Sequence, residues 1–259
     1  MNYESGLNIK LTDDPIGFEY LEDLFGPEVE NRKLDDIRQS LKNPDCNGPD
    51  VVYSIAMDVG KKIHLKDLKK RNLLFGIVRF AAGRLGDEPV RSQGHIHALS
   101  ASCNMSTPEV YEIWSGEAII YMQETALDDP GRCFAVKCKP GEVVIVPPGW
   151  AHSTISSNPA NPLTFGAWCV RDYGFEYNAV REHNGLAFFP ILDKKNNIIW
   201  QKNDCYQNSN LIIKSPNKYK AFAIKENIPI YTQYEKNNDL FMFVADPTLK
   251  KDEWNDFIP

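Results

Sequence analysis

The sequence predicts an all-β fold, built around one antiparallel barrel or sandwich. Short apolar or alternating runs recur from about residue 49 to about residue 180 and are separated by Gly and Pro, which is typical of antiparallel strands joined by tight turns. No stretch with helical periodicity separates these runs, so a parallel α/β sheet is not expected. The runs are LLFGIVRFAAG, VYEIWSGEAIIYMQ, CFAVKCKPGEVVIVPPG and LTFGAWCV.

A lead-in with one helix is predicted over residues 1–48. The segment LDDIRQSLKNP places three apolar side chains on one helical face, and Pro44 ends the helix. The three apolar residues are Leu34, Ile37 and Leu41.

The barrel itself is predicted to span residues 49–189, and residues 190–259 form a C-terminal β-rich extension packed on it. The extension is rich in Asn and Lys, but it holds too many aromatic residues to remain solvated and disordered. Its strand-like runs are NNIIW, NLIIK, YKAFAI and DLFMFVA.

Composition and charge exclude several classes of function. The chain has 259 residues, 42% of them hydrophobic, which is enough to bury one sizeable core. Its net charge is −6, and no basic run could neutralise phosphates along a polynucleotide, so no nucleic-acid partner is expected. The segment MNYESGLNIK lacks a signal-peptide pattern, and no apolar stretch approaches the roughly 18 residues of a membrane span. We therefore expect a cytoplasmic protein with no membrane partner.

The residues that carry chemistry lie in the barrel segment. In GHIH, His95 and His97 are two residues apart, so on a strand both imidazoles point to the same face. Glu109 and Tyr111 share a face of the next strand for the same reason. His152 follows a Pro-Gly turn, which holds its imidazole at a fixed point.

Together, His95, His97, Glu109 and His152 are predicted to hold one divalent transition metal. Each residue alone has a plainer explanation, because paired histidines occur on surface strands and a single carboxylate is usually solvated. The joint pattern favours a metal, and it leaves one or two coordination positions open, as in catalytic sites. The ligand set suits Fe, Mn, Ni or Zn and does not choose among them.

The same residues resemble the two sequence motifs of the cupins. The first motif is matched by the HxH pair followed by Glu109-x6-Gly116, with a longer spacer than usual between the histidines and the glutamate. The second is matched by Gly141-x5-Pro147-x-Gly149-x2-His152, with Ser156 where Asn is usual. The resemblance implies a double-stranded β-helix, or jelly-roll, barrel.

Within the cupins, the chain is similar to the cupin-type glucose-6-phosphate isomerases of archaea and some bacteria over about residues 45 to 190. The family signature runs through Gly-x-Glu, Thr-x-Gly-His-x-His and Glu-x-Tyr. This chain has Gly86-Asp87-Glu88, Ser92-Gln93-Gly94-His95-Ile96-His97 and Glu109-Val110-Tyr111.

This resemblance implies an enzyme that interconverts glucose 6-phosphate and fructose 6-phosphate, in glycolysis and gluconeogenesis, with Fe or Mn favoured as the metal. Glu109 is the candidate base that moves a proton between C1 and C2 through a cis-enediol, and a hydride shift remains an alternative. Tyr111 is the second catalytic candidate, as a hydrogen-bond donor to a substrate oxygen. The resemblance also implies a homodimer, for which the apolar face from Val110 to Trp114 could serve, unless it packs within the same chain.

The phosphate end of the family pattern is only half kept. Ser92, Gly94 and Tyr177 are the predicted donors to phosphate oxygens. Three departures replace family residues at this end, and three arginines offer compensating charge. The departures are Phe80 for a threonine, Phe175 for a histidine and Cys169 for a late tyrosine, and the arginines are Arg84, Arg91 and Arg181.

These departures motivate an alternative function. The chain could be a metallocupin that binds, senses or converts a different sugar or sugar derivative. A metal-free storage-type cupin is the third alternative, which element analysis of the purified protein would exclude.

Overall fold

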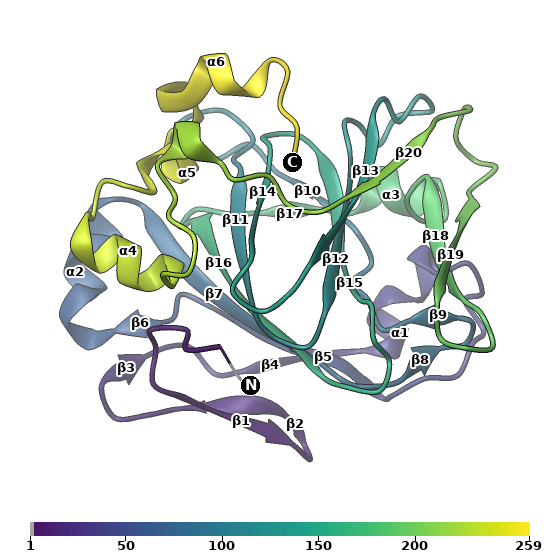
Figure 1. Cartoon of the computed structure of the whole chain (residues 1–259), viewed down its shortest axis with the longest axis horizontal. Coiled ribbons are helices and arrows are strands. Elements are labelled where there is room, and N and C mark those ends of the chain that lie inside the picture. Colours follow the sequence, from purple (N-terminus) through teal and green to yellow (C-terminus); the bar gives the residue numbers. More distant parts are fainter. Residues whose placement is uncertain (1–2) are drawn as a thin grey trace.

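The computed structural model describes residues 3–259, and two sheets form a barrel at its centre (Figure 1). The larger sheet is antiparallel throughout and has six strands in the order β14-β11-β16-β7-β5-β4. The smaller has four strands in the order β15-β12-β13-β20. The six are Val143–Val146, Glu109–Ser115, Leu163–Val170, Leu73–Phe80, Val51–Met57 and Glu30–Lys33, and the four are Ala151–Ser156, Ala118–Gln123, Cys133–Cys138 and Leu211–Lys214.

A continuous apolar core fills the space between the two sheets. Alternate residues of β11, β7 and β16 meet alternate residues of β12 and β13 there, as the period of two along each strand requires. Tyr111, Phe165 and Phe80 come from the larger sheet, and Met122 and Phe134 come from the smaller one. The predicted all-β cupin barrel is confirmed by this arrangement.

Short two-stranded ladders and small helices complete the fold around the barrel. No helix among residues 3–259 is long and apolar enough to cross a membrane. The ladders are β1 (Ile9–Asp13) with β2 (Ile16–Tyr20), β3 (Leu24–Phe25) with β6 (Gly60–Lys61), β8 (Arg84–Leu85) with β9 (Glu88–Pro89), β10 (Ile96–His97) with β17 (Phe175–Glu176), and β18 (Phe188–Leu192) with β19 (Ile198–Lys202). The first three α-helices are α1 (Leu34–Ile37), α2 (Leu65–Lys70) and α3 (Asn178–Glu182).

The lead-in contains more β-structure than the sequence suggested. The predicted helix is present as α1 followed by the 3-10 turn η1 (Arg38–Ser40), and its three apolar residues are buried as expected. Strand β4 precedes this helix and pairs with β5 at the edge of the six-stranded sheet. Its sequence, ENRK, is polar, so hydrophobic periodicity gave no signal for it.

The extension begins with strands and ends with helices. Two of its four strand-like runs are strands, in β19 and β20, and β20 lies parallel to β13. The other two runs, YKAFAI and DLFMFVA, were expected to be strands and are instead in the 3-10 turn η3 (Lys220–Phe222) and the helix α5 (Met242–Ala245). Short apolar runs do not distinguish strand from helix, and here tertiary packing decided between them. The helices α4 (Ile230–Lys236) and α6 (Lys251–Trp254) and the 3-10 turn η4 (Pro247–Lys250) complete this part of the chain.

The helices of the extension cover the outer face of the six-stranded sheet, beside β16 and β7 (Figure 1). Trp168 on β16 is fully buried there and stacks on Tyr231, with ring centroids 5.5 Å apart, and on Phe241, at 5.4 Å. Val110 and Trp114 lie in the same apolar cluster. The apolar face considered as a dimer interface therefore packs within this chain.

A buried carboxyl group, Glu112, lies on this covered face of β11. It accepts hydrogen bonds from Trp114 Nε1 at 2.9 Å, from the backbone N of Ile230 at 2.9 Å and from the Tyr3 hydroxyl at 3.3 Å. Burial outweighs these donors and raises the pKa of Glu112 from its ordinary value of 4.5 to about 8. The folded protein therefore keeps a proton on Glu112 that the unfolded chain releases.

This proton predicts a specific dependence of stability on pH. Between about pH 4.5 and pH 8, Glu112 should lower the free energy of unfolding by about 1.4 kcal/mol for each unit of rising pH. Glu112→Gln, which carries no titratable proton, should lose this contribution. Urea unfolding of both proteins at several pH values measures it, and parallel pH profiles for the two proteins would contradict it.

Candidate metal centre

The four predicted ligands come together from three separate segments of the barrel. His95 and His97 lie at β10, Glu109 begins β11, and His152 is in β15. One side-chain nitrogen or oxygen from each residue lies within 4.8 Å of the others. Backbone hydrogen bonds in both directions join His95 to His152, at 3.0 and 2.9 Å, and hold the two segments in register.

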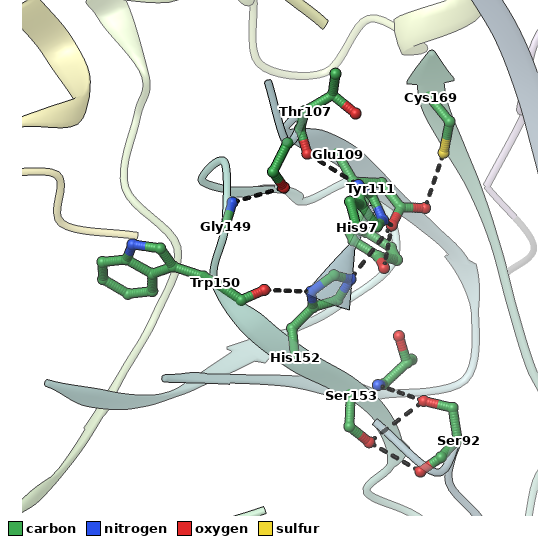
Figure 2. Close-up of polar contacts among 12 residues, drawn as sticks. Ser92, His97, Thr107, Glu109, Tyr111, Gly149, Trp150, His152, Ser153 and Cys169 are labelled. Carbon is green, nitrogen blue, oxygen red and sulfur yellow. Dashed lines mark hydrogen bonds and ion pairs between the residues drawn. The ribbon is translucent and has the colours of Figure 1, made fainter. Parts of the chain in front are cut away.

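Hydrogen bonds to backbone carbonyls orient two of the imidazoles. His97 Nδ1 lies 2.9 Å from the carbonyl oxygen of Thr107, and His152 Nδ1 lies 3.0 Å from that of Trp150 (Figure 2). A carbonyl only accepts, so each Nδ1 must carry the hydrogen, and in the neutral ring Nε2 is left with a free lone pair. Both Nε2 atoms face the centre of the cluster, as metal ligands require.

The donor set of the cluster fits a cation. His97 Nε2 lies 3.1 Å from Glu109 Oε2, so two hydrogen-bond acceptors face each other at contact distance unless a cation or a proton lies between them. The Nε2 atoms of His95 and His152 are buried and have no hydrogen-bond partner. Buried polar atoms are nearly always paired, so these atoms are consistent with a bound cation.

The protonation states agree with this assignment. Burial, together with the neighbouring imidazoles, lowers the pKa of His95 and His152 below its ordinary value. At neutral pH, His95 and His152 therefore present lone pairs to the cluster.

Two donors hold the carboxylate of Glu109 from the other side. The Tyr111 hydroxyl donates to Glu109 Oε2 at 2.6 Å, and the Cys169 thiol donates to Glu109 Oε1 at 3.1 Å (Figure 2). Burial raises the pKa of the Tyr111 hydroxyl and of the Cys169 thiol well above their ordinary values, so both groups keep their hydrogens. In this structure Tyr111 orients Glu109, and Cys169, which the sequence marked only as a departure from the family pattern, has the same role.

A small pocket with a cavity volume of about 60 Å³ opens beside the cluster. His95, Glu109 and Tyr111 line it, so one side of the cluster is accessible from the pocket.

The pocket also contains two of the three predicted phosphate-binding residues. Ser92 and Tyr177 line it, and the Ser92 hydroxyl oxygen accepts a hydrogen bond from the backbone N of Thr154 at 3.1 Å. Gly94 is not among the lining residues. Its φ is +92°, a backbone conformation that favours glycine, and a Cβ at this position would lie 2.9 Å from Leu186 Cδ1. Any other residue at position 94 would therefore strain the backbone and crowd Leu186.

Apolar groups fill the places where the family pattern departs. Phe80 and Phe175 both line the pocket, and the ring of Phe175 packs edge-on against His95, with centroids 4.5 Å apart. Phe80 is buried and packs against Phe165 at 5.8 Å. The hydroxyl and imidazole expected at these two positions are absent from the pocket.

None of the three arginines proposed to compensate lines the pocket. Arg91 is buried in an ion pair with Glu88 at 2.7 Å, and Arg84 donates to the backbone of Asp193. Arg181 donates twice to the Gln93 side chain, at 3.0 and 3.1 Å. A different arginine, Arg32 of β4, lines the pocket, and sequence reasoning missed it because β4 itself gave no signal.

A family model and curated relatives similar to this chain carry the same description. The family model "Glucose-6-phosphate isomerase (GPI)" matches residues 36–208. Glucose-6-phosphate isomerases from Thermococcus litoralis and Pyrococcus furiosus are 29% and 30% identical over 114 residues, which is 44% of this chain and 55% of each relative. The chain thus spans about half the length of the curated relatives it matches.

Solved structures with a similar arrangement are more distant. An oxalate oxidase matches with a TM-score of 0.37 at 14% identity, and the match covers 48% of this chain and 54% of the oxidase chain. A vicilin from Corylus avellana matches with a TM-score of 0.36 at 12% identity, and the match covers 50% of this chain and 33% of the vicilin chain.

Proposed function

The chain belongs to the glucose-6-phosphate isomerase family, and from that premise we propose that it interconverts glucose 6-phosphate and fructose 6-phosphate at a divalent metal held by His95, His97, Glu109 and His152. The observation that supports the metal most strongly is the approach of His97 Nε2 to Glu109 Oε2 at 3.1 Å. The Thr107 carbonyl holds the hydrogen of His97 on Nδ1, so the lone pair of His97 Nε2 faces a lone pair of Glu109 Oε2. A cation bound between these two atoms removes their repulsion.

The residues of the site have separate roles in this proposal. When bound, a divalent metal supplies Lewis-acid stabilisation of the negative charge that develops on substrate oxygens. Glu109 accepts a proton from one of the two reacting carbons and returns it to the other, as a general base and then acid. Tyr111 and Cys169 hold one oxygen each of its carboxylate, which restricts the directions from which the proton can be taken.

The same proposal includes several finer points that come from the family resemblance. We propose Fe or Mn as the metal, a homodimer as the assembly, the cytoplasm as the location and glycolysis and gluconeogenesis as the metabolic setting. Ser92 and Tyr177 are proposed as hydroxyl donors to the substrate, because both line the pocket.

A coupled assay tests the reaction and the substrate together. Glucose 6-phosphate and unphosphorylated glucose are offered to protein reconstituted with Fe, Mn, Ni or Zn in turn. We expect fructose 6-phosphate to form with at least Fe or Mn, and glucose to react far more slowly. Turnover of glucose in preference to glucose 6-phosphate would contradict the proposal and support a metallocupin with a different sugar substrate.

Isotope transfer separates the two chemical routes. Proton transfer through Glu109 in deuterated water should place solvent deuterium on the product, because a carboxyl group exchanges its proton with water. A direct hydride shift leaves the product free of solvent deuterium. Mass spectrometry of the fructose 6-phosphate formed measures the difference.

A further inference from the structure

Arg32 brings a positive charge into the pocket from outside the part of the chain that matches the family. It lies on β4, opposite Tyr53 of β5 in the register of the six-stranded sheet. The family match begins at residue 36, so Arg32 precedes it. No resemblance therefore assigns a role to this residue, although its side chain lines the same pocket as His95 and Glu109.

The guanidinium of Arg32 lies beside phenol groups at the pocket. Burial raises the pKa of Tyr53 and of Tyr177, and the positive charge of Arg32 opposes that rise at both. All three side chains line the pocket. The Tyr177 ring is also 5.9 Å from that of His95, so the cluster around Arg32 continues into the metal centre.

The charges around Arg32 leave it free to bind an anion. Its ion-pair partner is Glu30, at 3.1 Å, and the Glu30 side chain is 66% exposed, so the pair is weak and readily exchanged. Among the described residues that line the pocket, Glu109 is the one carboxylate, and it belongs to the metal centre. Arg181 adds a second positive charge near Tyr177, 5.1 Å from its ring centroid.

We propose that Arg32 binds the phosphate group of the sugar phosphate and so takes over the role of the phosphate-binding hydroxyl that is absent at Phe80. A guanidinium matches phosphate by two parallel hydrogen bonds, and the hydroxyls of Tyr177 and Ser92 supply further donors from the same pocket. This inference rests on the proposed function for the sugar part of the ligand. The anion site itself rests only on the residues of the pocket.

Binding measurements on the metal-loaded protein test the inference. Arg32→Gln should raise the Kd for glucose 6-phosphate by about 10- to 100-fold, because a charge-assisted hydrogen bond is lost. It should leave the Kd for glucose unchanged. Inorganic phosphate should compete with glucose 6-phosphate in the parent protein and compete poorly in Arg32→Gln. In steady-state assays, KM should rise with little change in kcat, because the phosphate lies away from the reacting carbons.

Three further variants serve as controls. Arg32→Lys keeps the charge without the paired donors and should give an intermediate Kd. Glu30→Gln removes the competing carboxylate and should leave the Kd equal or lower. Lys33→Gln removes a charge from an exposed residue of the same strand that does not line the pocket, and should leave the Kd unchanged.

The outcomes distinguish this inference from the proposed function. An equal Kd for glucose 6-phosphate in the parent protein and in a folded Arg32→Gln would overturn the inference, even if isomerisation is found. Phosphate binding that depends on Arg32 in a protein with no isomerase activity would support the anion site while the proposed function fails.

Discussion

Glu109→Gln is expected to lower kcat for glucose 6-phosphate isomerisation by about 10²- to 10⁴-fold, the usual contribution of a positioned general acid or base. Gln keeps the shape of Glu but can neither take a proton from carbon nor offer a negative charge to the metal. The loss of charge should also weaken metal binding, because the Glu109 carboxylate lies against His97 and His152 at 3.1 and 3.4 Å. Initial rates and element analysis of the same sample measure the two losses separately.

Glu112→Gln is the matched control, because it makes the same substitution on the same strand. Glu112 lies on the outer, covered face of β11 and does not line the pocket. The metal content and kcat of the Glu112→Gln protein should equal those of the parent protein. A Glu109→Gln protein that binds metal and keeps most of the parent kcat would show that Glu109 is not the base.

His152→Ala is expected to remove the metal and, with it, the activity. His152 is buried, and its Nε2 atom has no hydrogen-bond partner, so this side chain is available as a metal ligand. A site reduced to two imidazoles and one carboxylate should lose affinity by well over the 10- to 100-fold typical of an outer-shell change. Element analysis after dialysis, together with Tm measured with and without added metal, reports the loss.

His183→Ala controls for the removal of an imidazole as such. His183 stacks on Tyr206 and contacts Asp128, away from the cluster. This variant should retain one metal per chain, and added metal should raise its Tm by as much as in the parent protein, because only a ligand that binds the folded state stabilises it. Equal metal content in His152→Ala and the parent protein would contradict the proposed ligand set.

The four clustered residues could be predicted from sequence because each follows from a local rule. Two histidines two residues apart share a face of a strand, and a Pro-Gly turn fixes the residue behind it. The motif spacing then identified Glu109 and His152 as members of the same group, and the structure brings all four within 4.8 Å.

Other parts of the site had no local signal. The thiol of Cys169 reaches Glu109 only because β16 lies beside β11 in the sheet, and strand order cannot be read from a single strand. Arg32 lies on a polar strand that pairs with β5 at the edge of the sheet and has no hydrophobic pattern. A residue of this kind can be found only when the long-range pairing is known.

The helical end of the extension shows the same limit. Phe222 and Phe243 were expected on strands because they lie in short strand-like runs, but both pack in the aromatic cluster outside the six-stranded sheet. A short apolar run fits a strand and also fits one turn of helix with two buried side chains. The covering of β7 and β16 on both faces, which decided the outcome, is a property of the whole fold.

Stoichiometric metal reconstitution tests most directly whether one metal at these four residues is required for isomerisation of glucose 6-phosphate. Protein stripped by a chelator, and shown by element analysis to be metal-free, is titrated with Fe or Mn while fructose 6-phosphate formation is measured. We expect no activity at the start, a rise in proportion to bound metal, and a plateau at one metal per chain. Full activity in the metal-free protein would contradict this expectation.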